Sequence, residues 1–311
     1  MKFYSKYIVA ASLLAAATTV RTAIAQDDVE ALSGKIIHPV NPTPGLPAPT
    51  AGSTRAIRPP ISYHGGPIIG TPTIYTIWYG NWNQSNGSDT PAGQQIVRDF
   101  LHGLGGSPYY QTNASYNGVS GNLNIGAEYT DTGSQGTSLS DAQIQTIVST
   151  AISGGHLPLD NNGIYFVLTS SNIAETSGFC TAYCGWHTHG TISGTDIKYA
   201  FVGNSNACLS ACAIQTTGPN GNAGVDGMVS VIAHETEETN TDPDLNAWFS
   251  RSGQEDADMC AWTFGQSQTQ LASGAWYNMT LPGLSGSRNY EIQRELDSNS
   301  KCYVDYVTKA Q

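Results

Sequence analysis

Six cysteines in the second half of the chain place the strongest constraint on how it can fold. They form two pairs with a Cys-x3-Cys spacing and two isolated positions: Cys180, Cys184, Cys208, Cys212, Cys260 and Cys302. An even number of cysteines is typical of disulfide bonds formed in an oxidising compartment. We predict that Cys260 pairs with Cys302 and that the first four connect two neighbouring loops. The alternative is a zinc knuckle in which the Cys-x3-Cys pairs act with His187 and His189.

The beginning of the chain indicates the same compartment. Lys2 and Lys6 precede a mostly apolar run over residues 7–20, and Ala23-Ile24-Ala25 offers a small-x-small cleavage site. This pattern predicts a signal peptide over residues 1–25 and a secreted, extracellular protein. The apolar run is shorter than the ~20 residues that a membrane span needs, so no membrane anchor is expected after cleavage.

Residues 26–60 contain seven prolines and little apolar periodicity. Such a composition predicts a Pro-rich linker or pro-segment without fixed structure. Sequons that permit N-glycosylation in a secreted glycoprotein occur at Asn83, Asn86, Asn113 and Asn278.

The remaining chain, residues 61–311, mixes both kinds of secondary structure. Stretches that alternate or are rich in β-branched residues predict strands at 73–79, 122–129, 163–168 and 197–202. Apolar residues at helical spacing, preceded by capping residues, predict three helices. These cover 91–104, a segment that begins after Ser140 and ends at Gly154, and about 225–239. Without repeats or a second low-complexity boundary, this order favours a single α+β domain with a mixed sheet.

Acidic residues outnumber basic ones, and they are concentrated in one place. The chain has 24 Asp and Glu against 13 Lys and Arg, a net charge of −11, which argues against a nucleic-acid partner. Eight of the acids lie within residues 235–258, accompanied by Arg251 as the one base. A carboxylate cluster with so little compensating charge predicts a cation site.

The helix expected over 225–239 carries the motif His234-Glu235-x-x-Glu238. At 100° per residue, His234 and Glu238 lie about 40° apart and one turn along, so both can reach one metal ion. Glu235 is turned about 100° away, where a general base can activate water. Gly227 and Ser230 extend this face with small side chains, which predicts room for a ligand. The apolar residues on the opposite side are expected to face the core: Val225, Met228, Val229, Ile232 and Ala233.

A zinc site needs a third protein ligand, and the acidic segment after this helix offers two. We rank Asp258 first and Glu255 second, while His187 or His189 could serve as a ligand or as a transition-state hydrogen-bond donor. Asp242 lies too far along the helix and is expected to cap a turn. The motif follows the arrangement of HExxH zinc peptidases with Glu in place of the second His, so Zn²⁺ is the expected cofactor. Carboxylate-rich ligation also suits Ca²⁺ or Mn²⁺, and a chain without any metal is the remaining alternative.

Five segments carry a family resemblance. They are Tyr63-His64-Gly-Gly-Pro67, Ile77-Trp-Tyr-Gly80, Gly178-Phe-Cys180, Val202-Gly-Asn-Ser205 and Pro219-Asn-Gly-Asn-Ala-Gly-Val-Asp-Gly-Met228. Together with the Cys-x3-Cys pairs, they resemble the EXORDIUM and phosphate-induced protein 1 family of secreted, cell-wall-associated proteins. The resemblance implies a zincin-like scaffold with an active-site helix and disulfide-linked loops. Plant members have small or aliphatic residues at the positions of His234, Glu235 and Glu238, so the resemblance implies that they lack the metal residues.

Two functions follow from these observations. The first is a secreted zinc-dependent metallohydrolase that cleaves a peptide or another extracellular or cell-wall substrate. The second is a non-catalytic extracellular protein of the EXORDIUM type, in which the acidic cluster is a structural or calcium site.

Overall fold

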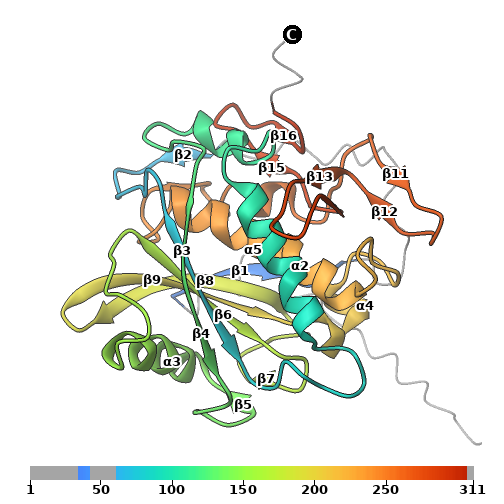
Figure 1. The fold of residues 1–311 in the computed structure, drawn as a ribbon. Helices are drawn as coiled ribbons and strands as arrows, with labels where there is room; N and C mark the ends of the chain where they lie inside the picture. Colours follow the sequence, from blue (N-terminus) through green and yellow to red (C-terminus); the bar gives the residue numbers. More distant parts are fainter. Residues whose placement is uncertain (1–33, 43–60, 307–311) are drawn as a thin grey trace, which may run out of the picture.

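A mixed sheet of six strands forms the centre of the computed structural model, which describes residues 34–42 and 61–306 (Figure 1). The strands are, in sheet order, β1 (Ile36–Pro39), β8 (Tyr183–Ile192), β9 (Thr195–Gly203), β6 (Gly163–Thr169), β3 (Thr73–Tyr79) and β4 (Asn124–Asp131). The last four run parallel to one another, whereas β8 is antiparallel to β9, and β1 is antiparallel to β8. The predicted α+β class with a mixed sheet is therefore confirmed.

Helices cover both faces of this sheet (Figure 1). Helix α3 (Asp141–Ser153) lies on one face, and helices α2 (Pro91–Leu104) and α5 (Ala223–Thr241) lie on the other. Each begins at a residue suited to that position: Thr90 accepts a hydrogen bond from the Gly93 amide, Ser140 forms a capping box with Gln143, and Asn222 accepts from the Val225 amide. The three helices predicted from the sequence are therefore present.

Short elements join and surround these layers. They are the strands β2 (Ser62–Tyr63), β5 (Ser138–Leu139), β7 (Ala174–Glu175), β10 (Trp248–Phe249), β11 (Thr269–Gln270), β12 (Trp276–Tyr277), β13 (Met279–Leu281), β14 (Arg288–Tyr290), β15 (Glu295–Leu296) and β16 (Cys302–Tyr303), the helix α4 (Leu209–Cys212), and the 3₁₀ turns η1 (Tyr110–Ser115), η2 (Ser205–Ala207) and η3 (Asp258–Cys260). The short strands form two-stranded sheets, which pair β2 with β10, β5 with β7, β11 with β12, β13 with β14, and β15 with β16.

Helix α5 is buried along almost its whole length. The apolar residues expected to face the core are all fully buried, as predicted. The opposite side is buried as well, because every residue from Gly224 to Thr241 is covered. The prediction of room for a ligand beside Gly227 and Ser230 is therefore wrong. A methyl group at Gly227 would lie 2.9 Å from Ala213 Cα, and the Ser230 hydroxyl accepts a hydrogen bond from the Gln293 backbone amide.

Strand β1 corrects the prediction that residues 26–60 lack fixed structure. Ile36 and Ile37 pair with His187 and Trp186 at the edge of the sheet, and the Trp262 indole donates to the Pro39 carbonyl. Lys35, just before the strand, is buried and forms an ion pair with the partly exposed Asp141. These long-range contacts outweigh the local Pro-rich composition, which by itself favours an open chain.

Three disulfide bonds join the loops around the sheet. Cys260 pairs with Cys302 as predicted, and the Cys-x3-Cys pairs are linked to each other through Cys180–Cys208 and Cys184–Cys212. All six cysteines are consumed in this way, so the zinc-knuckle alternative is wrong. The predicted signal peptide lies outside the described residues. Within those residues, no helix combines the length and the apolar character needed to cross a bilayer.

Candidate metal centre

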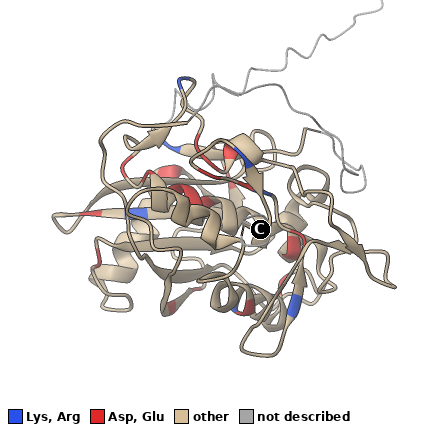
Figure 2. Ribbon diagram, turned by 90° about the horizontal axis from the view of Figure 1, so that it is seen from above, with Lys and Arg blue, Asp and Glu red and all other residues tan. Residues whose placement is uncertain are grey.

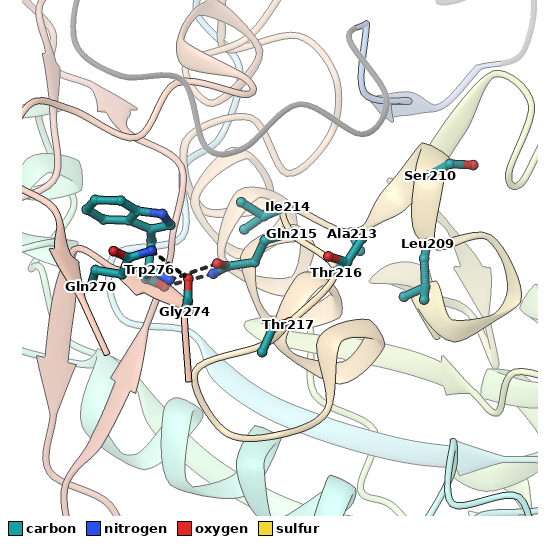
Figure 3. Close-up of a pocket in the computed structure, with 10 residues that line it drawn as sticks. All are labelled: Leu209, Ser210, Ala213, Ile214, Gln215, Thr216, Thr217, Gln270, Gly274 and Trp276. Atoms are coloured by element: carbon teal, nitrogen blue, oxygen red, sulfur yellow. Dashed lines mark hydrogen bonds between the residues drawn. The ribbon is translucent and has the colours of Figure 1, made fainter. Parts of the chain in front are cut away.

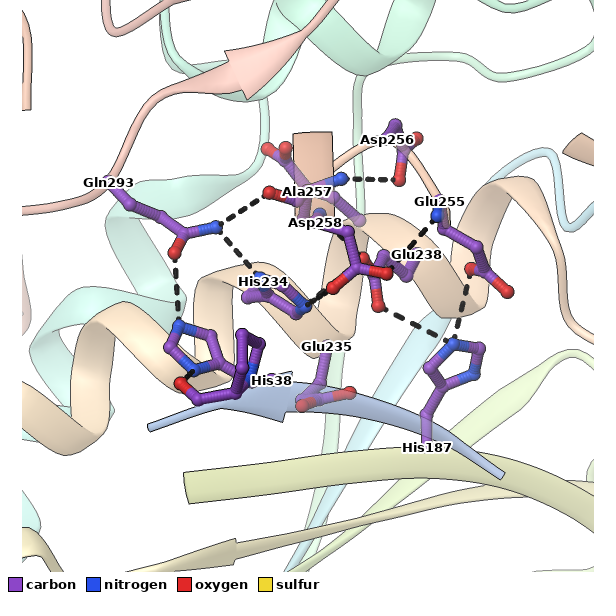
Figure 4. Close-up of polar contacts among 12 residues, drawn as sticks. His38, His187, His234, Glu235, Glu238, Glu255, Asp256, Ala257, Asp258 and Gln293 are labelled. Atoms are coloured by element: carbon purple, nitrogen blue, oxygen red, sulfur yellow. Dashed lines mark hydrogen bonds and ion pairs between the residues drawn. The ribbon is translucent and has the colours of Figure 1, made fainter. Parts of the chain in front are cut away.

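Three side chains of the predicted site converge beside helix α5 (Figure 4). His234 and Glu238 project from neighbouring turns, and His234 Nε2 lies 3.0 Å from Glu238 Oε1. Asp258, at the start of η3, places Oδ1 3.6 Å from His234 Nε2. One potential ligand atom from each residue lies within 4.8 Å of the other two. The HExxE spacing and the preferred third residue therefore meet in one place.

A second group lies next to the first and shares Glu238. His187 extends from β8, and its Nε2 lies 3.2 Å from Glu255 Oε2 and 3.7 Å from Glu238 Oε2. The two residues proposed as alternative third ligands thus approach different imidazoles, Asp258 that of His234 and Glu255 that of His187.

The spacing of these atoms suits metal coordination. Two ligands at about 2.0 Å from a tetrahedral zinc ion lie about 3.3 Å apart. The distances from His234 Nε2 to its two carboxylates are 3.0 and 3.6 Å, and those from His187 Nε2 are 3.2 and 3.7 Å, so they lie on both sides of that value. The separations of 3.0 and 3.2 Å also suit an N–H···O hydrogen bond, and His187 Nε2 forms one with Glu255 Oε2, whereas 3.6 and 3.7 Å are too long for one.

Burial provides an independent sign that the centre is adapted to a cation. His187, His234, Glu235, Glu238 and Glu255 have no exposed surface. Within the part of the chain that the structure describes, no hydrogen-bond partner reaches His234 Nε2, Glu238 Oε2, Glu255 Oε1 or either oxygen of Glu235. A buried polar atom without a partner costs free energy, most of all when it carries charge. The donor set therefore fits a bound metal ion.

The protein alone disfavours charge on these groups. Burial raises the pKa of Glu238 and of Glu255 well above the usual range, and the neighbouring carboxylates raise both pKa values further. Burial lowers the pKa of His187 to about 3 and that of His234 well below its usual range, so both imidazoles are neutral. Neutral imidazole is the form that binds metals, whereas the carboxylates need a cation to remain ionised.

Glu235 extends from the helix toward the edge of the sheet (Figure 4), close enough to Asp258 and Glu238 for the carboxylates to raise one another's pKa. Its carboxylate lies beside the backbone of His38 on β1, and a methyl group at Gly185 on β8 would lie 3.0 Å from Glu235 Oε1. Strand β1 thus occupies the space in front of the predicted general base.

Two residues that the sequence analysis did not select support His234 from behind. Gln293 Nε2 lies 2.8 Å from His234 Nδ1 and also donates to the Ala257 carbonyl at 3.3 Å, while Gln293 Oε1 lies 3.0 Å from His38 Nε2. The rings of His38 and His234 contact each other with centroids 4.3 Å apart. These contacts hold the His234 ring in one orientation. Neither residue stands in a local motif, so sequence spacing had no means of finding them.

Two other residues considered in the sequence make different contacts. His189 is on the same strand as His187 but two residues further along, where it contacts Asp196 and Asp244, so of the two histidines predicted as alternatives only His187 reaches this centre. Asp242 ends α5 and accepts hydrogen bonds from the amides of Asn246 and Ala247, which confirms its predicted capping of a turn.

The four sequons differ in accessibility. Asn83 and Asn86 are exposed. Asn113 is fully buried, with its amide donating to the Glu237 carbonyl, so the prediction of a glycan there is wrong. The Asn278 amide donates to the carbonyls of Phe264 and Ile292, and a glycan would disrupt both bonds.

The charge distribution and a surface pocket beside α4 add no residue to this centre. Lys and Arg appear at few places beside the more numerous Asp and Glu (Figure 2), in line with the net charge of −11. A pocket of about 520 Å³ opens between α4 and β12, lined by Leu209, Ile214 and Trp276 among others (Figure 3). None of the candidate metal residues lines it.

Glu291 provides a test of buried charge away from the metal residues. It is 2% exposed, and neither carboxylate oxygen has a hydrogen-bond partner among the described residues. Burial raises its pKa from 4.5 to about 8. The folded state binds this proton more tightly than the unfolded state does. The protonated Glu291 side chain therefore makes its full contribution to the free energy of unfolding below about pH 4.5, and this contribution is lost as the pH rises to about 8.

We therefore expect Glu291→Gln to stabilise the protein at pH 8 relative to wild type, by up to about 4 kcal/mol, and to have little effect at pH 4.5. Chemical denaturation of both proteins at the two pH values measures the difference. An equal difference at both would show that Glu291 does not titrate in this way.

The chain is thus a disulfide-bonded α+β protein with a buried cluster of histidines and carboxylates beside helix α5. The model of the family described as "Phosphate-induced protein 1 conserved region" matches residues 61–283. The chain belongs to this family, as the resemblance in the sequence implied.

Curated relatives agree with this assignment. The chain is 32% identical to Protein EXORDIUM-like 3 of Arabidopsis thaliana over 251 residues, covering 69% of this chain and 72% of the relative. It is 32% identical to Protein EXORDIUM-like 5 of the same plant, with 69% and 67% covered. Protein PHOSPHATE-INDUCED 1 of Nicotiana tabacum is 27% identical, with 73% and 76% covered. No solved structure matches the chain.

Proposed function

We propose that this protein is a secreted, zinc-dependent hydrolase of peptides or of another extracellular or cell-wall substrate. The observation that carries the proposal is the convergence of His234, Glu238 and Asp258 from α5 and η3. Placement of this helix against a mixed sheet, with Glu235 turned toward the sheet edge, supports a zincin-like arrangement. The three disulfide bonds support an extracellular location.

Each residue has a defined task in this proposal. His234, Glu238 and Asp258 would hold the zinc ion, which supplies Lewis-acid polarisation of a carbonyl and a more acidic water. Glu235 would act as the general base, because its buried carboxylate has a strengthened affinity for a proton. Gln293 would hold the His234 ring in position.

The centre is closed in this arrangement, and β1 forms part of its cover. His38 on β1 contacts the ring of His234, and its backbone lies beside Glu235. Removal or displacement of β1 would expose the edge of β8 next to the general base. An extended peptide can pair with such an edge, which favours a peptide as the substrate. We therefore expect activity to increase when β1 is weakened.

Complete burial of the ligands favours a second candidate function. A metal ion enclosed on all sides is typical of a structural site, which would make the protein a non-catalytic, extracellular member of the EXORDIUM type. Each group contains an imidazole, which suits zinc better than Ca²⁺, whose ligands are oxygen atoms.

Hydrolysis of a peptide panel distinguishes these candidates. Ile37→Asp introduces a charge where Ile37 is 1% exposed, so it weakens β1. The zinc-loaded variant should cleave peptides faster than wild type. Adding Glu235→Gln should lower the rate about 100-fold or more and leave the zinc bound.

Glu237→Gln is the matched control, because Glu237 is an equally buried carboxylate on another side of α5. In the Ile37→Asp background it should retain activity. Absence of cleavage by both wild type and Ile37→Asp, each folded and fully loaded with zinc, would contradict the catalytic function and leave the structural one.

A further inference from the structure

Glu238 faces two imidazoles, one with each carboxylate oxygen. Oε1 lies 3.0 Å from His234 Nε2, whereas Oε2 lies 3.7 Å from His187 Nε2 (Figure 4). His234 comes from the same helix and His187 from β8, so the carboxylate stands between the helix and the sheet. A carboxylate with a different nitrogen ligand at each oxygen has the arrangement of a bridge between two ions.

We propose that this centre binds two divalent cations bridged by Glu238. The first ion takes His234 and Asp258, and the second takes His187 and Glu255. The proposal rests on the proposed function in one respect, namely that the first group binds a metal, and it adds a second site to that group.

Unpartnered atoms in the second group point to a ligand there. Glu238 Oε2 and Glu255 Oε1 are buried and have no hydrogen-bond partner among residues 34–42 and 61–306. Glu238 Oε1, by contrast, accepts from the Asp258 amide at 2.9 Å. The oxygen that faces His187 is therefore the one left without a donor, as expected if it is adapted to a cation.

Charge also favours a second cation. A divalent ion in the first group is neutralised by Glu238 and Asp258 when both are ionised. Glu235 and Glu255 would then stay buried without an ion pair to any Lys or Arg that the structure describes. A second divalent cation offsets these two charges, whereas without it both carboxylates must take up protons or remain uncompensated in the interior.

A contrasting group shows what a satisfied cluster looks like in this protein. His189, Asp196 and Asp244 also lie close enough together to hold a metal ion. There the Lys198 ammonium lies 3.0 Å from Asp196 and 3.1 Å from Asp244, so a side-chain cation already supplies the charge. The group at His187 and Glu255 has no such lysine among the described residues.

The chemistry of the donors indicates the kind of ion. One imidazole with carboxylates suits Zn²⁺ or Mn²⁺. In two-metal centres that act on a substrate, the ions lie about 3.5–4 Å apart, a separation that a single bridging carboxylate spans.

Metal stoichiometry tests the proposal without relying on activity. The full-length protein is stripped with a chelator, titrated with Zn²⁺ alone in a calorimeter, and analysed for zinc after gel filtration. Two zinc ions per chain are expected. Binding of one ion per chain would overturn the two-metal proposal and leave the proposed zinc site intact. Binding of no ion would overturn both proposals.

Variants locate the second ion. His187→Ala should bind one zinc ion per chain, whereas His189→Ala, which removes a histidine from the same strand outside the centre, should bind two. Two ions in His187→Ala would overturn the assignment. Should His187→Ala fail to fold, electron paramagnetic resonance of the wild-type protein loaded with Mn²⁺ decides: two bridged ions give an exchange-coupled spectrum, and two isolated ions would overturn the bridge.

Discussion

Removal of bound zinc is expected to lower the melting temperature of this protein by roughly 10 °C. An ion at about 1,000 times its dissociation constant stabilises the folded state by about 4 kcal/mol, and each kcal/mol corresponds to a few degrees in a chain of this size. The effect is large here because Glu235, Glu238 and Glu255 are fully buried. Without a cation they must take up protons or remain as uncompensated charge.

Differential scanning calorimetry of the zinc-loaded protein, with and without chelator, measures this shift. Glu238→Gln is the informative comparison, because it removes the carboxylate common to both groups and should abolish the response to chelator. An unchanged melting temperature after zinc has demonstrably been removed would contradict a metal centre that stabilises the fold.

Loss of the Cys260–Cys302 disulfide is expected to destabilise the protein and to weaken zinc binding together. The bond closes a loop of 42 residues, which corresponds to about 4 kcal/mol of chain entropy. Cys260 also ends η3, the turn that begins at Asp258, so the disulfide holds a proposed ligand in place. The double variant Cys260→Ser/Cys302→Ser should therefore bind zinc about 10-fold or more weakly.

The double variant Cys180→Ser/Cys208→Ser is the matched control. Its disulfide lies outside the metal cluster, and Cys184–Cys212 still joins the same two segments in this variant, so stability should fall by a smaller amount while the zinc affinity is kept. Chemical denaturation and zinc titration of both variants measure the two quantities. Equal loss of zinc affinity in both would show that η3 depends on overall stability and not on its own disulfide.

Local patterns in the sequence were sufficient for much of the fold. The helices over Pro91–Leu104, Asp141–Ser153 and Ala223–Thr241 agree with predictions from capping residues and apolar periodicity. Strand β8 was not predicted, because its two glycines, one tryptophan and two histidines show no simple alternation. Strand β1 was not predicted either, since its stability depends on pairing with β8 and on the buried Lys35.

The candidate metal centre, too, could be predicted from the sequence only in part. The spacing of His234 and Glu238 follows from helix geometry, which repeats every 3.6 residues and needs no knowledge of the rest of the fold. The selection between Asp258 and Glu255 could not be made, because it depends on which imidazole each loop carboxylate approaches. His38 and Gln293 stand far from the motif in sequence, and only folding brings them to His234.

The sequence by itself determined that one helix carries a histidine and a glutamate able to share a ligand, within an acidic stretch that lacks compensating bases. That information is local, because a helix repeats over a few residues. Only the tertiary structure decided that the cluster is buried, that β1 covers it, and that His187 and Glu255 form a second group around Glu238. Those features depend on contacts between segments tens to hundreds of residues apart, which no local pattern encodes.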